Sequence, residues 1–182
     1  WLKGPATSIS LTIHDASGQE VAKLTPSKNS GVNRAVWNLR HPSLPAQTYR
    51  YMDAERSRPL PGRLALPGVY TARLVVDGAV SERKFTVIED RRLRVTPAAR
   101  TAWNRALETL AASYLEATAL IEQTKSASSQ VLQETAIQAQ ARLATLYGNV
   151  GASTGPPTAD QAKQIAALSK FVADLKGQVP GR

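Results

Sequence analysis

The chain has 182 residues, a formal net charge of +9 and no cysteine. This length suffices for one large or two small domains that fold without covalent staples. The lack of cysteine excludes disulfides, thiolate metal sites and thiol catalysis. No apolar run approaches the roughly 20 residues that a membrane helix needs, so the sequence predicts a soluble chain.

The positive charge raises the question of an anionic partner such as nucleic acid, an acidic glycan or lipid headgroups. Lysines and arginines are scattered along the chain rather than gathered in one stripe, and no nucleic-acid-binding motif accompanies them. Recognised nucleic-acid binders usually show both features. We therefore expect a charged, solvated surface and no nucleic-acid partner.

The first forty residues alternate polar and apolar side chains, which is the pattern of half-buried strands. Residues 7–14 and 21–25 are predicted to pair across a turn at residues 15–18. Residues 32–39 are predicted to form a third strand, with Val32 and Val36 in the core. Trp37 in that strand is the large residue around which a small β-domain would pack.

Residues 66–90 read as a complete β-hairpin. The first strand places Tyr70 and Leu74 on one apolar face, and the return strand places Phe85 on the same kind of face. Between the strands, Asp77-Gly78 is a two-residue turn whose tight type I′ form needs positive φ at both positions. An isolated hairpin is barely stable in water, so partner strands and a second layer are expected.

Between these hairpins lies a Pro-rich insertion, residues 40–65, without periodicity and too long for an ordinary turn. A connection of this length is usually functional or disordered. It carries the densest group of basic and aromatic side chains in the chain, and such residues are enriched at interaction hot spots. The candidate interaction surface consists of Tyr49, Arg50, Tyr51, Arg56, Arg58 and Arg63.

The second half has helical periodicity, with three apolar stripes predicting helices at about residues 97–125, 129–148 and 158–177. Thr96-Pro97 is a helix start, and Thr158 with Gln161 forms a capping box. Trp103 opens the first stripe. Because each helix has a single apolar face, we expect an antiparallel three-helix bundle over residues 96–182, following a β-sandwich over residues 1–95. A coiled coil with another chain is the alternative use of the stripes.

Catalytic and metal-binding patterns are not found in the sequence. His14 and His41 lack the companions of a metal site, and the segment after His14 lacks the spacing of a calcium loop. Asp77 belongs to a turn, and Glu89 and Asp90 lie among arginines, where a surface salt-bridge cluster is the simpler account than a glycosidase carboxylate pair. We expect neither an enzyme nor a cofactor.

Three segments carry a resemblance to a known family: 13–18 (IHDASG), 31–40 (GVNRAVWNLR) and 66–74 (LPGVYTARL). Together they resemble the C-terminal region of large secreted bacterial proteins whose main body is a β-propeller with sialidase-like Asp-box (BNR) repeats, of the sortilin or glycosyl-hydrolase-like type. The second and third segments are also similar to the immunoglobulin-like domain of the flagellar hook-capping protein and to bacterial secretion-tail modules. The resemblance covers residues 7–90.

The resemblance implies an α+β chain with an immunoglobulin-like antiparallel sandwich followed by the three helices. Gly31 and Gly68 would open strands at positive φ, and Asn33 would bond a neighbouring turn. The expected structural core consists of Trp37, Tyr70, Leu74, Phe85 and Trp103.

For function, the resemblance implies a non-catalytic accessory module that docks on or supports an upstream β-propeller of the same polypeptide. The start at Trp1 without a methionine predicts a targeting signal upstream and an exported protein, secreted, periplasmic or in the cell envelope. A carbohydrate- or cell-surface-binding module is the alternative, with Tyr49 and Tyr51 stacking on acidic sugars. Part of a glycoside hydrolase active unit is the third hypothesis.

Overall fold

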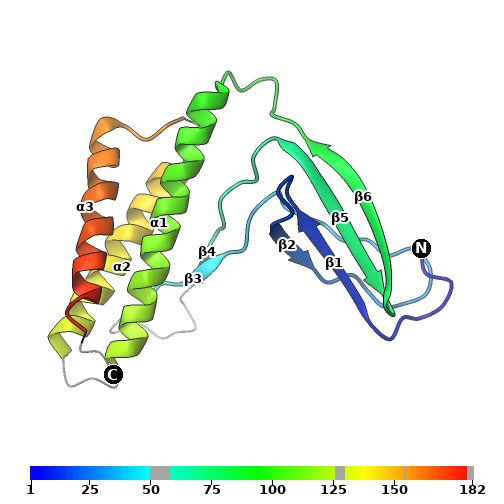
Figure 1. The fold of residues 1–182 in the computed structure, drawn as a ribbon, viewed down its shortest axis with the longest axis horizontal. Coiled ribbons are helices and arrows are strands. Elements are labelled where there is room, and N and C mark those ends of the chain that lie inside the picture. Colours follow the sequence, from blue (N-terminus) through cyan, green and yellow to red (C-terminus); the bar gives the residue numbers. More distant parts are fainter. Residues whose placement is uncertain (50–57, 126–129, 154, 180–182) are drawn as a thin grey trace. The chain divides into compact units, whose positions relative to one another are not determined.

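The computed structural model describes residues 1–49, 58–125, 130–153 and 155–179. They form a mixed α+β protein with a four-stranded antiparallel sheet, a two-stranded sheet and three packed helices (Figure 1). The chain divides into a sheet unit, Trp1–Pro42 with Leu64–Arg94, and a helical unit, Ser43–Arg63 with Val95–Arg182. The chain therefore leaves the sheet unit, contributes a segment to the helical unit, and returns before the helices begin.

The sheet unit is built on four strands in the order β2-β1-β5-β6, every neighbouring pair antiparallel. The strands are β1 (Ile9–His14), β2 (Glu20–Leu24), β5 (Gly68–Val76) and β6 (Ala79–Val87). The two predicted hairpins thus lie side by side in one sheet, with β1 paired to β5.

The predicted turn between β5 and β6 is confirmed. Asp77 has φ 48° and Gly78 has φ 88°, the left-handed pair that a type I′ turn requires. Asp77 also ties the turn to the segment before β1, because its Oδ1 accepts from the Ser8 amide at 2.7 Å and its own amide donates to the Ser8 carbonyl at 3.0 Å.

A small apolar cluster covers one part of the sheet. The aromatic rings of Trp37, Tyr70 and Phe85 contact one another with centroids 5.4 to 6.1 Å apart, and the Tyr70 hydroxyl donates to the Leu66 carbonyl at 2.7 Å. Leu74 is only half-buried. The buried members are Ile13, Val21, Ala22, Tyr70 and Val87.

The predicted third strand at residues 32–39 is wrong. Val32 is 88% exposed and Val36 is 76% exposed, while Trp37 alone turns onto the aromatic cluster. Side-chain bonds replace a strand ladder here: the Asn33 amide donates to the Asn29 carbonyl at 2.8 Å and to the Gly31 carbonyl at 3.2 Å. The expected bond from Asn33 to a neighbouring turn is therefore confirmed.

Of the two glycines expected at positive φ, Gly31 has φ 93° and Gly68 has no positive φ. Gly68 is the first residue of β5 and pairs with Val87, so its backbone follows the strand. The prediction for Gly31 is confirmed in its backbone angle, and that for Gly68 is wrong.

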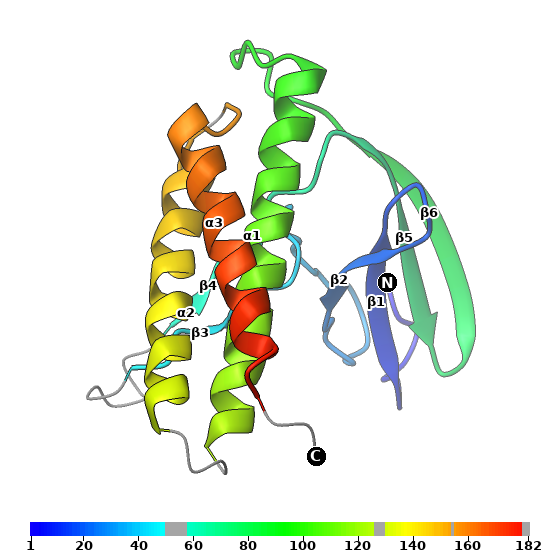
Figure 2. The ribbon, with the colours of Figure 1, turned by 60° about the vertical axis from the view of Figure 1, so that its left-hand side comes forward.

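The three helices are α1 (Pro97–Thr124), α2 (Gln130–Gly151) and α3 (Ala159–Lys176). Each contacts the other two, and the chain direction reverses from each helix to the next (Figure 2). The Thr96 hydroxyl accepts from the Ala99 amide at 3.2 Å, and Thr158 with Gln161 makes both bonds of the predicted capping box. α2 continues past Gly148, where its end was expected, to Gly151.

The Pro-rich insertion belongs to the helical unit, whereas the sequence placed it within the β-domain. Its described ends carry β3 (Leu44–Ala46) and β4 (Pro59–Leu60), which pair antiparallel with Leu44 opposite Leu60. We call residues 43–49 and 58–63 the strap. At the base of the insertion, the sheet unit closes it with a bridge between Arg40 and Leu64.

Candidate functional site

Two buried tyrosines of the helices hold the backbone of the strap. The Tyr114 hydroxyl on α1 donates to the Pro45 carbonyl at 2.9 Å. The Tyr147 hydroxyl on α2 donates to the Pro61 carbonyl at 3.1 Å. The tyrosine side chains are 0% and 4% exposed. A tyrosine hydroxyl usually has a hydrogen-bond partner when its side chain is buried, and the two strap carbonyls are those partners here.

A buried glutamine makes the third attachment. Gln140 on α2 is 0% exposed, its Oε1 accepts from the Thr48 amide at 2.7 Å, and its Nε2 donates to the Thr118 hydroxyl oxygen at 2.8 Å. Thr118 in turn donates to the Tyr114 carbonyl at 2.8 Å. Buried polar atoms are costly unless they are paired, so this chain of bonds links the strap, α2 and α1 cooperatively.

An ion pair closes the far end of the strap. Arg63 contacts Glu108 of α1 at 2.8 Å, with side chains 19% and 46% exposed. A partly exposed pair of this kind contributes at most about 1 kcal/mol. The buried hydrogen bonds, together with Leu44 at 8% exposure, therefore account for most of the attachment.

Burial also changes the acidity of Tyr114. Removal from water, with a smaller contribution from nearby Tyr49, raises the pKa of Tyr114 from 10.0 to about 12. The phenol thus keeps its proton and its role as a donor to Pro45 across the neutral range and well above it.

The structure describes only three of the six residues predicted to form the interaction surface. Tyr49 is 43% exposed and its hydroxyl donates to the Gln47 side chain at 3.3 Å, and Arg58 is exposed. Arg63 is paired with Glu108 and serves the strap instead. Arg50, Tyr51 and Arg56 lie outside the described residues. The structure thus leaves Tyr49 and Arg58 available at the two ends of the segment that the strap anchors enclose.

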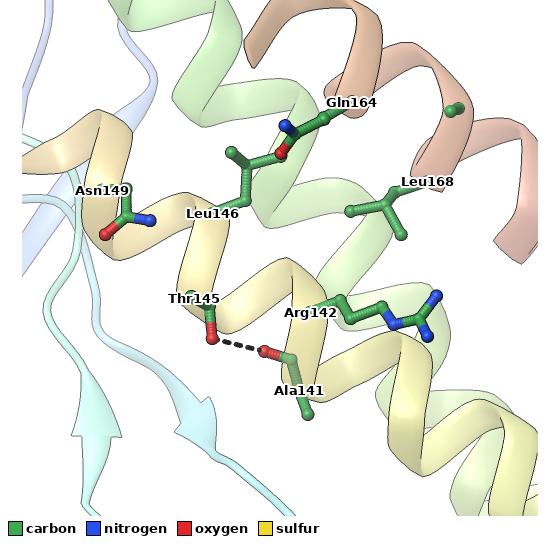
Figure 3. A pocket seen from close by; sticks show the side chains of 8 residues that line it. Ala141, Arg142, Thr145, Leu146, Asn149, Gln164 and Leu168 are labelled. Carbon is green, nitrogen blue, oxygen red and sulfur yellow. Dashed lines mark hydrogen bonds between the residues drawn. The ribbon is translucent and has the colours of Figure 1, made fainter. Parts of the chain in front are cut away.

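An open groove of about 550 Å³ lies between α2 and α3 (Figure 3). Leu146 and Leu168 give it an apolar floor, and the Thr145 hydroxyl is satisfied within α2 by the Ala141 carbonyl at 3.1 Å. The lining residues are Ala141, Arg142, Thr145, Leu146 and Asn149 of α2 with Gln164, Ala167 and Leu168 of α3.

A second pocket, of about 430 Å³, lies on the polar face of the four-stranded sheet. His14, Thr71 and Lys84 stand in register across β1, β5 and β6, and Arg73 pairs with Glu82 at 3.7 Å in the adjoining row. The remaining lining residues are Asp15, Ala16, Gly18 and Val69. The pocket therefore brings both signs of charge together and is suited to a polar ligand.

Neither acidic nor imidazole groups in this pocket are arranged for a metal ion. The His14 ring nitrogens contact the Thr12 hydroxyl at 2.8 Å and the Gly18 carbonyl at 3.1 Å. Asp15 accepts from the hydroxyl and amide of Ser17 and from the Gln19 amide, and the Ser17 hydroxyl is the main cause of the lowered pKa of Asp15. Within the described ranges, no group of three potential metal ligands converges.

The residues that anchor the strap are not predicted by the sequence pattern. Tyr114 lies in the apolar stripe of α1, where the spacing says nothing of its hydroxyl, and Gln140 is a polar residue between two buried stripe positions, Ala139 and Leu143. A glutamine next to stripe residues is a weak signal of a buried amide, because exposed glutamines are far more common in helices.

Comparison with known proteins finds no family model, no curated protein and no solved structure that matches the chain. Among the residues that the structure describes, no helix combines the length and the apolar character needed to cross a membrane.

Proposed function

We propose that this chain is a non-catalytic interaction module of a larger exported protein, and that it contacts its partner through residues 49–58. The observation that carries the proposal is the anchoring of the strap on both sides of that segment, by Thr48 and Pro45 before it and by Pro61 and Arg63 after it. Binding segments are commonly displayed from a rigid scaffold in this way. Tyr49 and Arg58 are the described residues that border residues 50–57 on either side.

The proposed partner is a β-propeller of the sialidase-like, Asp-box type in the same polypeptide. This part of the proposal rests on the three sequence segments that resemble such proteins, as do the immunoglobulin-like classification of residues 1–95 and the expected location outside the cytoplasm. The paired hairpins and the Trp37 cluster are compatible with that classification.

The first step of the test is to ask whether the reading frame that encodes this chain also encodes Asp-box repeats. If Asp-box repeats are encoded there, calorimetric titration of the 182-residue chain with the separately produced propeller should show saturable binding. Replacing residues 50–57 by two glycines should abolish binding and leave the fold intact, because the strap anchors that the structure describes lie outside the replaced segment. Arg58→Glu should weaken binding, whereas the exposed Arg91→Glu in the sheet unit should not.

Well-folded partners that do not bind, or binding that survives replacement of residues 50–57, would contradict the proposal. Circular dichroism of the replaced chain distinguishes loss of the contact from loss of the fold.

Carbohydrate binding is the second candidate, favoured by the polar pocket of the sheet with Arg73, Lys84 and His14. A panel of acidic glycans should then give hits with the intact chain that Lys84→Glu removes. Hits that Tyr49→Ala removes instead would place the carbohydrate site at Tyr49, and no hits would reject this candidate.

A further inference from the structure

The two flanks of α2 differ in what covers them. On one flank Gln140, Ala144 and Tyr147 are buried, and Gln140 and Tyr147 bond the strap. On the other flank Arg142, Leu146 and Asn149, spaced as i, i+4 and i+7, line the open groove (Figure 3). The chain's own extended segment thus packs beside one flank, and the other flank remains open.

α3 carries a second apolar stripe beside the one that packs in the bundle. Ile165, Val172 and Leu175 are buried. The second stripe consists of Ala167, Leu168 and Phe171, and the polar Gln164 precedes them on the same face at the spacing i, i+3, i+4, i+7. Leu168 is half-buried and Phe171 is 40% exposed. Since residues at this spacing lie on one face of a helix, Phe171 continues the face of the groove-lining Ala167 and Leu168 by about one turn of α3.

The charge of the groove is one-sided. Arg142 is the charged residue among those that line it, and none of the lining residues is acidic. Its side chain extends from α2 towards α3 beside Leu168 (Figure 3), and no ion pair engages it within the described residues. The chain as a whole carries a net charge of +9. An occupant with a carboxylate is therefore complementary to this site.

We propose that the groove between α2 and α3 binds an acidic amphipathic helix of another protein, as a fourth helix of the bundle. Two neighbouring helices present ridges and grooves into which a third element of the same geometry packs. The 18 residues of α3 span about 27 Å, which matches a docked helix of similar length. The partner's apolar stripe would cover Leu146, Leu168 and Phe171, and an aspartate or glutamate would meet Arg142. A second copy of this chain fits less well, because its net charge of +9 opposes association of two copies.

Synthetic peptides of about 20 residues test the proposal on the full chain. Two amphipathic helices share one leucine and alanine stripe but carry either glutamates or lysines beside it, and fluorescence anisotropy measures their affinity. The glutamate peptide should bind saturably and at least about ten-fold more tightly than its lysine twin. Arg142→Glu should reverse that preference. Ala167→Glu should lower the affinity for the glutamate peptide at least about ten-fold. The matched control is Ala166→Glu, at an exposed residue on the other side of α3, which should leave that affinity unchanged.

The proposal fails if the glutamate peptide does not saturate at millimolar concentration, if both peptides bind equally, or if Ala166→Glu acts like Ala167→Glu. Sedimentation of the chain alone tests whether a second copy of the chain fills the groove instead. Self-association that Ala167→Glu abolishes would show that it does, and would overturn the proposal. Arg142 is exposed, so Arg142→Glu should leave the fold intact. Its effect on peptide preference therefore tests the proposal even if Ala167→Glu perturbs folding.

Discussion

Gln140 is the residue on which the attachment of the strap depends most. A carboxamide at 0% exposure has its oxygen and its nitrogen used by Thr48 and Thr118, which lie on different segments of the helical unit. The carboxamide therefore supplies an acceptor to one segment and a donor to the other, which an apolar side chain of similar volume cannot do.

We predict that Gln140→Leu lowers the free energy of unfolding by about 1–3 kcal/mol, because the Thr48 amide and the Thr118 hydroxyl lose their partner while the volume is nearly kept. Urea denaturation followed by circular dichroism measures the change. Gln138→Leu on the exposed side of α2 is the control and should alter stability little. Equal effects of the two substitutions would show that the buried bonds contribute nothing specific.

Tyr114 predicts a dependence of stability on pH. Its pKa is 10.0 in an unfolded chain and about 12 in the folded one, so above pH 10 the folded state holds a proton that the unfolded state has released. Stability should therefore be unaffected by this group below about pH 9 and fall as the pH rises from 10 towards 12. Tyr114→Phe should be less stable at neutral pH by about 1 kcal/mol but lose less between pH 10 and 12. A steeper alkaline loss in Tyr114→Phe than in the parent chain would contradict the raised pKa.

At the scale of elements, the β5–β6 hairpin shows the strongest agreement of sequence and structure. Asp77-Gly78 dictates the turn, and the turn sets a register that runs from Val76 opposite Ala79 to Gly68 opposite Val87. The caps at Thr96 and Thr158 act in the same local way on α1 and α3. All of these signals concern residues within four positions of one another.

Gly78→Ala should destabilise the chain by about 1–2 kcal/mol, because an alanine at φ 88° brings its Cβ towards the following carbonyl. Thermal melting of the sheet signal is the measurement. Gly68→Ala is the matched control: Gly68 has ordinary φ and open space around its Cα, so its substitution should be neutral or slightly stabilising. A neutral Gly78→Ala would mean that the turn does not govern the hairpin.

The elements that sequence reasoning missed depend on distant partners. Val32 and Val36 are spaced as in a strand, yet the segment forms none: Asn33 bonds back to the preceding backbone, and both valines are exposed. The insertion has no periodicity of its own, and its anchors lie far along the chain, with Thr48 bonded to Gln140. Periodicity and capping report local preference only, so they predict neither the strap nor the groove between α2 and α3.

At the scale of the whole molecule, the number and order of helices follow from the sequence, but the membership of residues 43–63 does not. The strap lies between the two segments of the sheet unit in the sequence, but it packs on helices that follow later in the chain. Without the strap, the helical unit would expose the apolar surface that Leu44 covers. The side chains of Tyr114, Tyr147 and Gln140 would also lose their hydrogen bonds to the strap backbone. The strap is thus expected to be part of the cooperative unit that the helices form.

Hydrogen exchange at single-residue resolution tests this most directly. The Thr48 amide, bonded to Gln140, should exchange with the same opening free energy as amides in the middle of α2, and Gln140→Leu should release it. Fast exchange at Thr48 in a chain whose helices stay fully protected would show that the strap opens independently, and would contradict its place in the helical unit.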